Sequence, residues 1–79
     1  MARIVQMLDG VTTAQFEIDK PEIRIGRSPE CDVYIDDPSV SNIHCVIETV
    51  PPTEETRRPE YHIRDLGSTN GTYVNIDRV

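Results

Sequence analysis

The chain has 79 residues, of which 37% are hydrophobic, and it contains no Trp and a single Phe. It can therefore form one domain at most, with a small core and too little apolar surface for a deep cofactor cavity, so no cofactor is expected. A formal net charge of −6, with only 8 Lys and Arg, argues against nucleic acid or an anionic membrane as a partner, since either would repel the chain.

Short segments of alternating apolar and polar residues, bounded by turn residues, recur along the chain, and this pattern is typical of an all-β protein. The predicted strands are, in chain order, Arg3–Leu8, Ala14–Ile18, Glu22–Gly26, Asp32–Ile35, His44–Thr49, Tyr61–Leu66 and Thr72–Ile76. Residues 50–60, "VPPTEETRRPE", carry three prolines among charges and predict an exposed loop. Short strands at such regular spacing predict a β-sandwich.

The predicted strand His44–Thr49 is apolar at several successive positions, as expected of a strand near a sheet centre that is buried on both faces. Cys45 lies within this run and is expected to be a small core residue. Two cysteines, Cys31 and Cys45, are too few for a disulfide framework and lie in no metal-ligand pattern, so no metal is expected. No apolar run approaches the roughly 18 residues of a membrane span, and the N-terminus does not resemble a signal peptide, so a cytoplasmic setting is expected.

Three loops hold most of the polar residues that could carry chemistry, and each lies where one predicted strand ends or the next begins. They contain, in chain order, Gly26-Arg27, Ser41-Asn42 with His44, and Ser68-Thr69-Asn70. A hairpin between the last two predicted strands would need only Asn70-Gly71 as its turn, so the additional hydroxyl and amide groups are either an idle loop or a surface that holds something polar. In a sandwich such loops can gather at one end, where binding loops commonly lie.

These residue types together suit one kind of ligand. An Arg guanidinium offers a planar fork of donors that matches phosphate oxygens, and a Ser hydroxyl and turn N–H groups add neutral donors. The set lacks the metal-binding carboxylates and the general base that phosphoryl transfer requires, so no catalytic residue is expected. Taken singly, each residue has a simpler explanation: Arg27 as a surface charge, His44 as a structural histidine and Asn70 as part of a turn.

The order and spacing of these residues carry a more specific signal. The segments "IRIGRSPECDVYIDDPSVSNIHCVIE" and "YHIRDLGSTNGTYVN" contain Gly-Arg, then Ser-x-x-His, then Asp-x-Gly-Ser-Thr-Asn-Gly-Thr. From about Ile23 to Asn75 the chain resembles the forkhead-associated (FHA) domain. The resemblance implies a β-sandwich of two twisted sheets that binds phosphothreonine peptides through loops at one end, and hence a phosphorylated protein partner.

The resemblance implies roles for five residues at the binding surface. Arg27 and Ser41 resemble the phosphate-contacting pair of the family. Asn42 and Thr69 occupy positions that contact the phosphothreonine or the adjacent peptide backbone. Asn70 resembles the family's Asn that bonds the peptide main chain and shapes the loop.

Four further residues resemble supporting positions of the family. Gly26 and His44 look like architectural members, with His44 bracing the binding loops. Gly67 and Gly71 would permit the turns of their loop.

The family's fold continues past Val79 with two further strands, which lie inside one sheet beside the first strand. Three interpretations follow. The first is that residues 1–79 are a single FHA-like domain truncated at its C-terminal end. The second is that another chain, or a swapped copy of this one, supplies the missing strands, and the third is that a smaller sandwich stands alone. Truncation is the favoured expectation, and completion by another chain is the second.

The sequence therefore predicts a non-enzymatic phosphothreonine-peptide recognition module of a signalling protein, which recruits phosphorylated partners. The main alternative is a phosphate-independent assembly or oligomerisation module that uses an open sheet edge or a sandwich face. A hydrolase built on Ser41 and His44 is disfavoured because no oxyanion hole is evident.

Overall fold

The computed structural model describes residues 2–74 and 77–79 of the chain. The strands are β1 (Arg3–Leu8), β2 (Val11–Glu17), β3 (Glu22–Gly26), β4 (Val33–Tyr34), β5 (Cys45–Val50), β6 (Glu60–Asp65), β7 (Tyr73–Val74) and β8 (Asp77–Arg78). The last two residues of the predicted strand Thr72–Ile76 lie outside the described residues. Within the two described ranges, no helix is long and apolar enough to cross a membrane.

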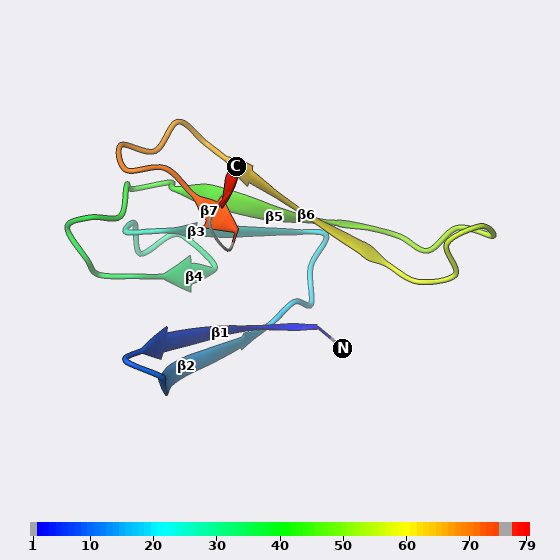
Figure 1. Ribbon diagram of the computed structural model, residues 1–79, viewed down its shortest axis with the longest axis horizontal. Helices are drawn as coiled ribbons and strands as arrows, with labels where there is room; N and C mark the ends of the chain where they lie inside the picture. The colour runs from blue at the N-terminus through cyan, green and yellow to red at the C-terminus, as the bar shows by residue number, and fades with distance from the viewer. Residues whose placement is uncertain (1, 75–76) are drawn as a thin grey trace.

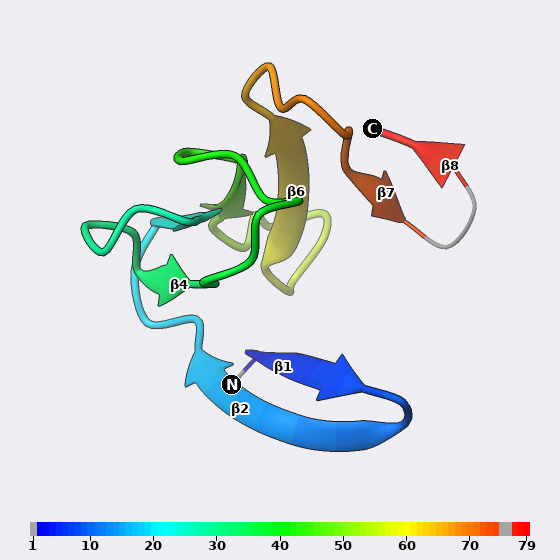
Figure 2. The ribbon, with the colours of Figure 1, turned by 90° about the vertical axis from the view of Figure 1, so that its left-hand side faces the viewer.

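The strands of the described residues form three sheets (Figure 1). The central sheet has the strand order β4-β3-β5-β6, with β3 parallel to β4 and antiparallel to β5, and with β5 antiparallel to β6. The pairs β1–β2 and β7–β8 are separate antiparallel hairpins, which Figure 2 shows on different sides of the central sheet. The all-β class predicted from the sequence is confirmed.

The core lies on the face of the central sheet that is turned toward the β1–β2 hairpin. Ile23, Ile47 and Ile63 are direct partners in register and form a row across β3, β5 and β6. Phe16 of β2 lies across from Ile23 and Val33, and these three side chains help to line a cleft of about 240 Å³ between the hairpin and the sheet. The hairpin and the central sheet are thus two facing layers of a sandwich.

β5 lies inside the central sheet, between β3 and β6. Its neighbouring residues Cys45 and Val46 are 4% and 1% exposed, and successive side chains of a strand point to opposite faces. The strand is therefore buried on both faces, and the predictions for this strand and for Cys45 as a core residue are confirmed.

Cys31 is also buried, and both thiols are free. Burial raises the pKa of the Cys45 thiol, which keeps it protonated and unreactive.

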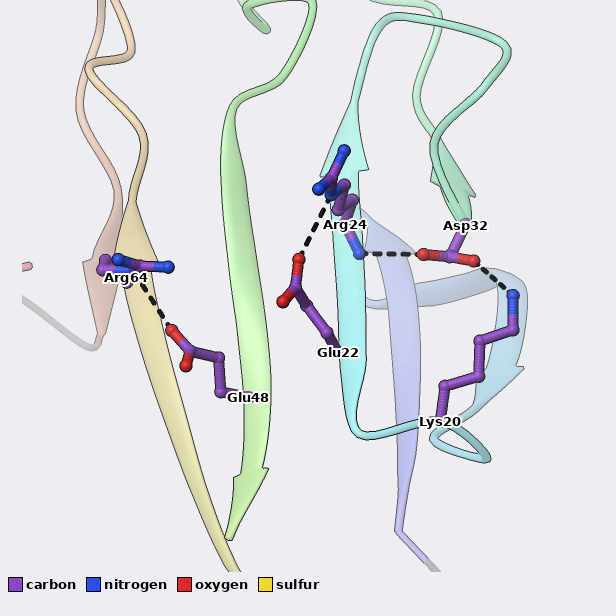
Figure 3. A network of polar contacts seen from close by, with 6 residues as sticks. All are labelled: Lys20, Glu22, Arg24, Asp32, Glu48 and Arg64. Carbon is purple, nitrogen blue, oxygen red and sulfur yellow. Dashed lines mark hydrogen bonds and ion pairs between the residues drawn. The ribbon is translucent and has the colours of Figure 1, made fainter.

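The other face of the central sheet carries charged side chains (Figure 3). Val46 lies in register between Arg24 and Arg64, whose aliphatic stems can cover it while their charged ends stay in water. Arg24–Glu22, Arg64–Glu48 and the contact of His62 with Glu60 lie on this face, and the Lys20–Asp32 pair lies at the β4 edge of the sheet. Exposed pairs of this kind contribute only about 0–1 kcal/mol each, so they identify the solvent side rather than hold the fold.

The predicted start of the second strand, at Ala14, is wrong because of the preceding turn. Asp9 and Gly10 both have positive φ, at 51° and 78°, as the two central residues of a type I′ hairpin turn require. This turn pairs Leu8 directly with Val11, so β2 begins there.

Residues 51–59 form an exposed loop between β5 and β6, within the loop predicted for residues 50–60.

Two short strands differ from the prediction. β4 is shorter than the predicted strand Asp32–Ile35, and at its first end the Asp32 carboxylate, rather than a backbone carbonyl, accepts the N–H of Arg24 at 3.0 Å. β8 was not predicted, because Asp77-Arg78 has no apolar alternation.

Candidate functional site

A cleft of about 330 Å³ opens where the end of β3 meets two loops, residues 35–44 and 66–72. These segments are distant in sequence and gather at one end of the molecule, opposite the 51–59 loop (Figure 1). The cleft is lined by Arg27, Pro38, Ser39, Val40, Ser41, Asn42, Thr69 and Asn70. All five residues that the sequence suggests for the binding surface are in this lining. The four suggested supporting residues, Gly26, His44, Gly67 and Gly71, are not in the lining but lie on or next to the segments that form it.

Gly26, the last residue of β3, lets the 35–44 loop approach the strand closely. A Cβ atom at this position would overlap the carbonyl oxygen of Asn42, so only glycine leaves room for the loop. Two backbone hydrogen bonds then join the segments: Arg27 N–H to the Ser41 carbonyl at 3.0 Å, and Ser28 N–H to the Asn42 carbonyl at 3.1 Å. The backbone of Arg27 is fixed against the loop, while its side chain stays exposed.

Ser41 is held from three directions. Its carbonyl accepts from Arg27 N–H, its own N–H donates to His44 Nδ1 at 3.0 Å, and its hydroxyl oxygen accepts the N–H of Thr69 at 3.1 Å. Because the hydroxyl oxygen already accepts a hydrogen bond, its proton is left to donate. The Ser41 hydroxyl is therefore available as a hydrogen-bond donor at the cleft.

His44 connects the two loops from behind. Nδ1 accepts the N–H of Ser41, so the ring proton of the neutral imidazole lies on Nε2, which donates to the carbonyl of Gly71 at 2.8 Å. The His44 backbone adds two hydrogen bonds, donating to the carbonyl of Ile25 at 2.9 Å and accepting from the N–H of Leu66 at 3.0 Å. One half-buried side chain thus ties the 35–44 loop to the 66–72 loop.

Asn70 closes the opposite wall of the cleft. Its side-chain Nδ2 donates to the carbonyl of Ser39 at 2.7 Å, across 31 positions of sequence. The flanking Gly67 and Gly71 have φ values of 75° and 82°, a region that side chains other than glycine rarely adopt. The turns at both ends of the "GSTNG" segment therefore depend on these glycines.

Two carboxylates that shape the cleft walls were missed by the sequence reasoning. Asp37 accepts both the N–H and the hydroxyl of Ser39, at 2.8 and 2.6 Å, and the hydroxyl bond holds the pKa of Asp37 below its ordinary value. Asp65 accepts hydrogen bonds from Ser68 and Thr72, and these lower the pKa of Asp65 to about 2. The available signal was the Asp-x-Ser and Asp-x-x-Ser spacing, since Asp side chains commonly bond to the backbone of the turn that follows them.

Arg27 is the one charged residue in the lining, and the other lining groups are mainly hydroxyl, amide and backbone groups. This set can hold a single anion by charge-assisted hydrogen bonds from the guanidinium, supported by the Ser41 hydroxyl. A nucleophile would need a base beside the Ser41 hydroxyl, but His44 bonds to the Ser41 backbone and has both ring nitrogens engaged. The arrangement suits binding.

Comparison with known proteins identifies relatives of the chain. The FHA domain model matches residues 23–79. The chain is 41% identical over 64 residues to the oxoglutarate dehydrogenase inhibitor of Corynebacterium diphtheriae and 35% identical over 66 residues to the glycogen accumulation regulator GarA of Mycolicibacterium smegmatis. These matches cover 78% and 84% of this chain, but only 38% and 37% of the two relatives.

Two solved structures share the fold. The MEK1 FHA domain, in complex with the HOP1 pThr318 peptide, has a TM-score of 0.71 and 32% identity, with 85% of this chain and 66% of that chain covered. The FHA domain of TbPar42 has a TM-score of 0.64 and 31% identity, with 92% of this chain and 38% of that chain covered. The likeness to both domains confirms the predicted β-sandwich class, and the matched residues 23–79 show that the chain belongs to the FHA domain family.

Proposed function

We propose that this domain binds phosphothreonine-containing peptides in the cleft between the 35–44 and 66–72 loops. The observation that carries the proposal is the lining of the cleft, in which one guanidinium, from Arg27, lies among hydroxyl and amide groups. A related domain, the FHA domain of MEK1, is solved in complex with a phosphothreonine peptide, HOP1 pThr318. The wider role that follows is non-enzymatic recruitment of a phosphorylated protein partner.

Five of the eight lining residues have proposed roles that fit their positions and contacts. Arg27 supplies the charged fork and Ser41 the neutral donor for the phosphate, because no hydrogen bond among the described residues uses the proton of the Ser41 hydroxyl. Asn42 and Thr69 lie beside that pair and contact the phosphothreonine or the adjacent backbone. Asn70 bonds the peptide main chain.

Asn70 can contact the peptide main chain while it keeps its bond to Ser39. Its Nδ2 donates to the carbonyl of Ser39 at 2.7 Å, and an amide nitrogen carries two N–H donors, so the second remains for a peptide carbonyl. The fold therefore holds the Asn70 side chain in place before the peptide binds.

The affinity should be moderate. Charge-assisted hydrogen bonds contribute about 1.5–3 kcal/mol each. Two or three of them, less the cost of association, give a dissociation constant that is roughly micromolar. The net charge of −6 opposes an anionic ligand at long range, and this repulsion is strongest at low salt, where screening is weakest.

A binding assay with matched variants tests the proposal. Fluorescence anisotropy is measured with a degenerate phosphothreonine peptide library and with its unphosphorylated twin, for the wild type, Arg27→Ala and Arg58→Ala. Arg58 lies in the exposed 51–59 loop at the other end of the molecule, so its loss changes the charge equally without touching the cleft. Phosphate-dependent binding that only Arg27→Ala removes supports the proposal. Binding of both libraries alike, or equal loss in both variants, refutes it.

A further inference from the structure

Asp65 is an acidic residue on the core side of the central sheet. It is the last residue of β6 and the direct partner of Cys45, so its side chain lies on the core face of the central sheet and is half-buried. A carboxylate there needs compensation for its lost water. Among the described residues, none of the ion pairs involves Asp65.

Hydrogen bonds from the following loop supply that compensation. Oδ2 accepts the backbone N–H groups of Gly67 and Ser68, at 3.1 and 3.0 Å. Oδ1 accepts the hydroxyls of Ser68 and Thr72, the latter at 2.7 Å. All four donors come from residues 67–72, so every one of these bonds ties the carboxylate to the same loop.

The four bonds hold the loop at both of its ends. The bonds to Gly67 and Ser68 fix the outgoing side, and the bond to Thr72 fixes the returning side. Between these anchors lie only Thr69 and Asn70 with Gly71, and the first two are the loop's contribution to the cleft. Their contacts to the opposite wall, Thr69 N–H to the Ser41 hydroxyl and Asn70 Nδ2 to the Ser39 carbonyl, depend on where the anchors put them.

We propose that Asp65 is the positioning residue of the cleft: from outside the lining, it sets the reach of Thr69 and Asn70 toward the ligand. The inference rests on the proposed function, because the ligand is the proposed phosphothreonine peptide. Asp65 itself touches no ligand. Its effect on binding is that of pre-organisation, since a loop that is already ordered loses less entropy when the peptide arrives.

Asp32 provides a matched control. It is also an Asp whose carboxylate accepts a backbone N–H, from Arg24, and a side-chain donor, from Lys20. Its bonds lie beside β3 and β4, at the edge of the sheet shown in Figure 3, and neither Asp32 nor Lys20 is in the lining of the candidate site's cleft. Replacement of Asp32 therefore reports what the loss of a bonded carboxylate does to stability alone.

Two variants of Asp65 separate geometry from charge. Asp65→Ala removes all four acceptor contacts. Asp65→Asn keeps an acceptor oxygen for the two backbone N–H groups, and its amide can donate to the hydroxyls of Ser68 and Thr72, which can rotate to accept. A positioning role predicts that Asn restores most of the binding that Ala removes.

The experiment measures three quantities for the wild type, Asp65→Ala, Asp65→Asn and Asp32→Ala: the melting temperature, the affinity for the phosphothreonine library, and hydrogen exchange of the Thr69 amide without ligand. We expect Asp65→Ala to weaken binding about tenfold and to speed hydrogen exchange of the Thr69 amide by at least as much. For Asp65→Asn, the affinity and the exchange rate should stay within about threefold of the wild type. Asp32→Ala should leave the affinity and the Thr69 exchange rate unchanged. Thr72→Val, which removes a single bond, replaces Asp65→Ala if that variant does not fold.

The hydrogen-exchange measurement separates the positioning role of Asp65 from the proposed binding of phosphothreonine peptides. If the wild type binds no phosphopeptide but Asp65→Ala still selectively speeds Thr69 exchange, the proposed function fails and the positioning role stands. If Thr69 exchange follows the global stability equally in Asp65→Ala and Asp32→Ala, Asp65 is only a structural residue and the inference is overturned.

Discussion

The backbone N–H of Thr69 donates a hydrogen bond of 3.1 Å to the hydroxyl of Ser41, a residue 28 positions earlier in the chain. This bond joins the two walls of the cleft. It occupies the oxygen of Ser41 as an acceptor and so leaves the hydroxyl proton available to an anion. The cleft is thereby prepared as a donor site by contacts within the chain itself.

Ser41→Ala is expected to weaken phosphopeptide binding about tenfold or more, because it removes a donor worth about 1.5–3 kcal/mol to a charged acceptor. It also leaves the Thr69 N–H without its partner. Calorimetric titration with the phosphothreonine library measures the effect. Thr13→Val is the control, since the Thr13 hydroxyl bonds to the Gln6 carbonyl in the β1–β2 hairpin, away from the cleft lining, and its loss should change the affinity by less than about threefold. Equal affinities of Ser41→Ala and the wild type would contradict the role of Ser41.

Gly26→Ala is expected to lower both stability and binding. The added Cβ would overlap the Asn42 carbonyl and push the 35–44 loop away from β3, and forcing an extra methyl into a packed position typically costs about 1–3 kcal/mol.

Gly10→Ala is the matched control for Gly26→Ala. Gly10 has positive φ at 78° but no atom near its Cβ position, and it lies in the β1–β2 turn. This variant should lose about 1 kcal/mol of stability and keep its affinity. Denaturant unfolding and titration measure the two quantities. If the two glycine variants lose affinity alike, the close approach at Gly26 does not shape the cleft.

His44→Phe tests the link between the two loops. The ring of Phe fills similar space but leaves the Ser41 N–H and the Gly71 carbonyl without partners, which should lower the free energy of unfolding by about 1–3 kcal/mol. His62→Phe is a suitable control, because His62 is exposed on β6 and its side chain, within the part of the chain that the structure describes, bonds only to Glu60. Urea unfolding followed by circular dichroism gives both values. A loss in His44→Phe no greater than in His62→Phe would contradict the link.

The pH dependence of stability tests the Asp65 contacts. Hydrogen bonds, first from the Ser68 hydroxyl and then from Thr72, lower the pKa of Asp65 from 3.8 to about 2. The unfolded chain therefore binds this proton more readily than the folded one, so the ionised carboxylate stabilises the fold above about pH 4, and this stabilisation is lost as the pH falls to about 2.

A comparison with Asp65→Asn isolates that contribution. The difference in unfolding free energy between the wild type and the variant should be constant from about pH 7 to pH 5 and should shrink between about pH 4 and pH 2. Other carboxylates, such as Asp32 and Asp37, titrate in both proteins and cancel. Urea unfolding at several pH values measures the difference. A difference that keeps its full size at about pH 2 would mean that the ionised carboxylate is not what holds the loop.

Sequence patterns predict the central sheet well because apolar and polar residues alternate along its strands, and the register of the sheet places the apolar ones on a common face. Ile23 and Ile25 share one face of β3, and the apolar run around Cys45 reports burial on both faces of β5. The same patterns fail at the hairpin turn, because the positive φ of Asp9 is a backbone property with no periodic signature. They also fail at Asp77-Arg78, where pairing with β7 does not require apolar side chains.

The candidate site was predictable as a set of residues and not as an arrangement. The motif spacing selects Arg27, Ser41 and Asn70, all of which line one cleft. The sequence does not reveal that the hydroxyl of Ser41 is engaged by a backbone N–H, or that the Asn70 amide donates to the Ser39 carbonyl. These contacts join positions 28 and 31 residues apart, and only the folded chain brings them together.

The central claim is that a phosphothreonine sits between Arg27 and Ser41, and the most direct test is titration of the isotopically labelled chain with a phosphothreonine peptide, followed by nuclear magnetic resonance. The account predicts that the largest shifts occur at the Arg27 side-chain N–H and at the backbone N–H groups of Ser41 and Thr69, and that an unphosphorylated peptide leaves them in place. Shifts concentrated on the charged outer face around Glu48 and Arg64, or shifts that do not depend on the phosphate, would contradict it.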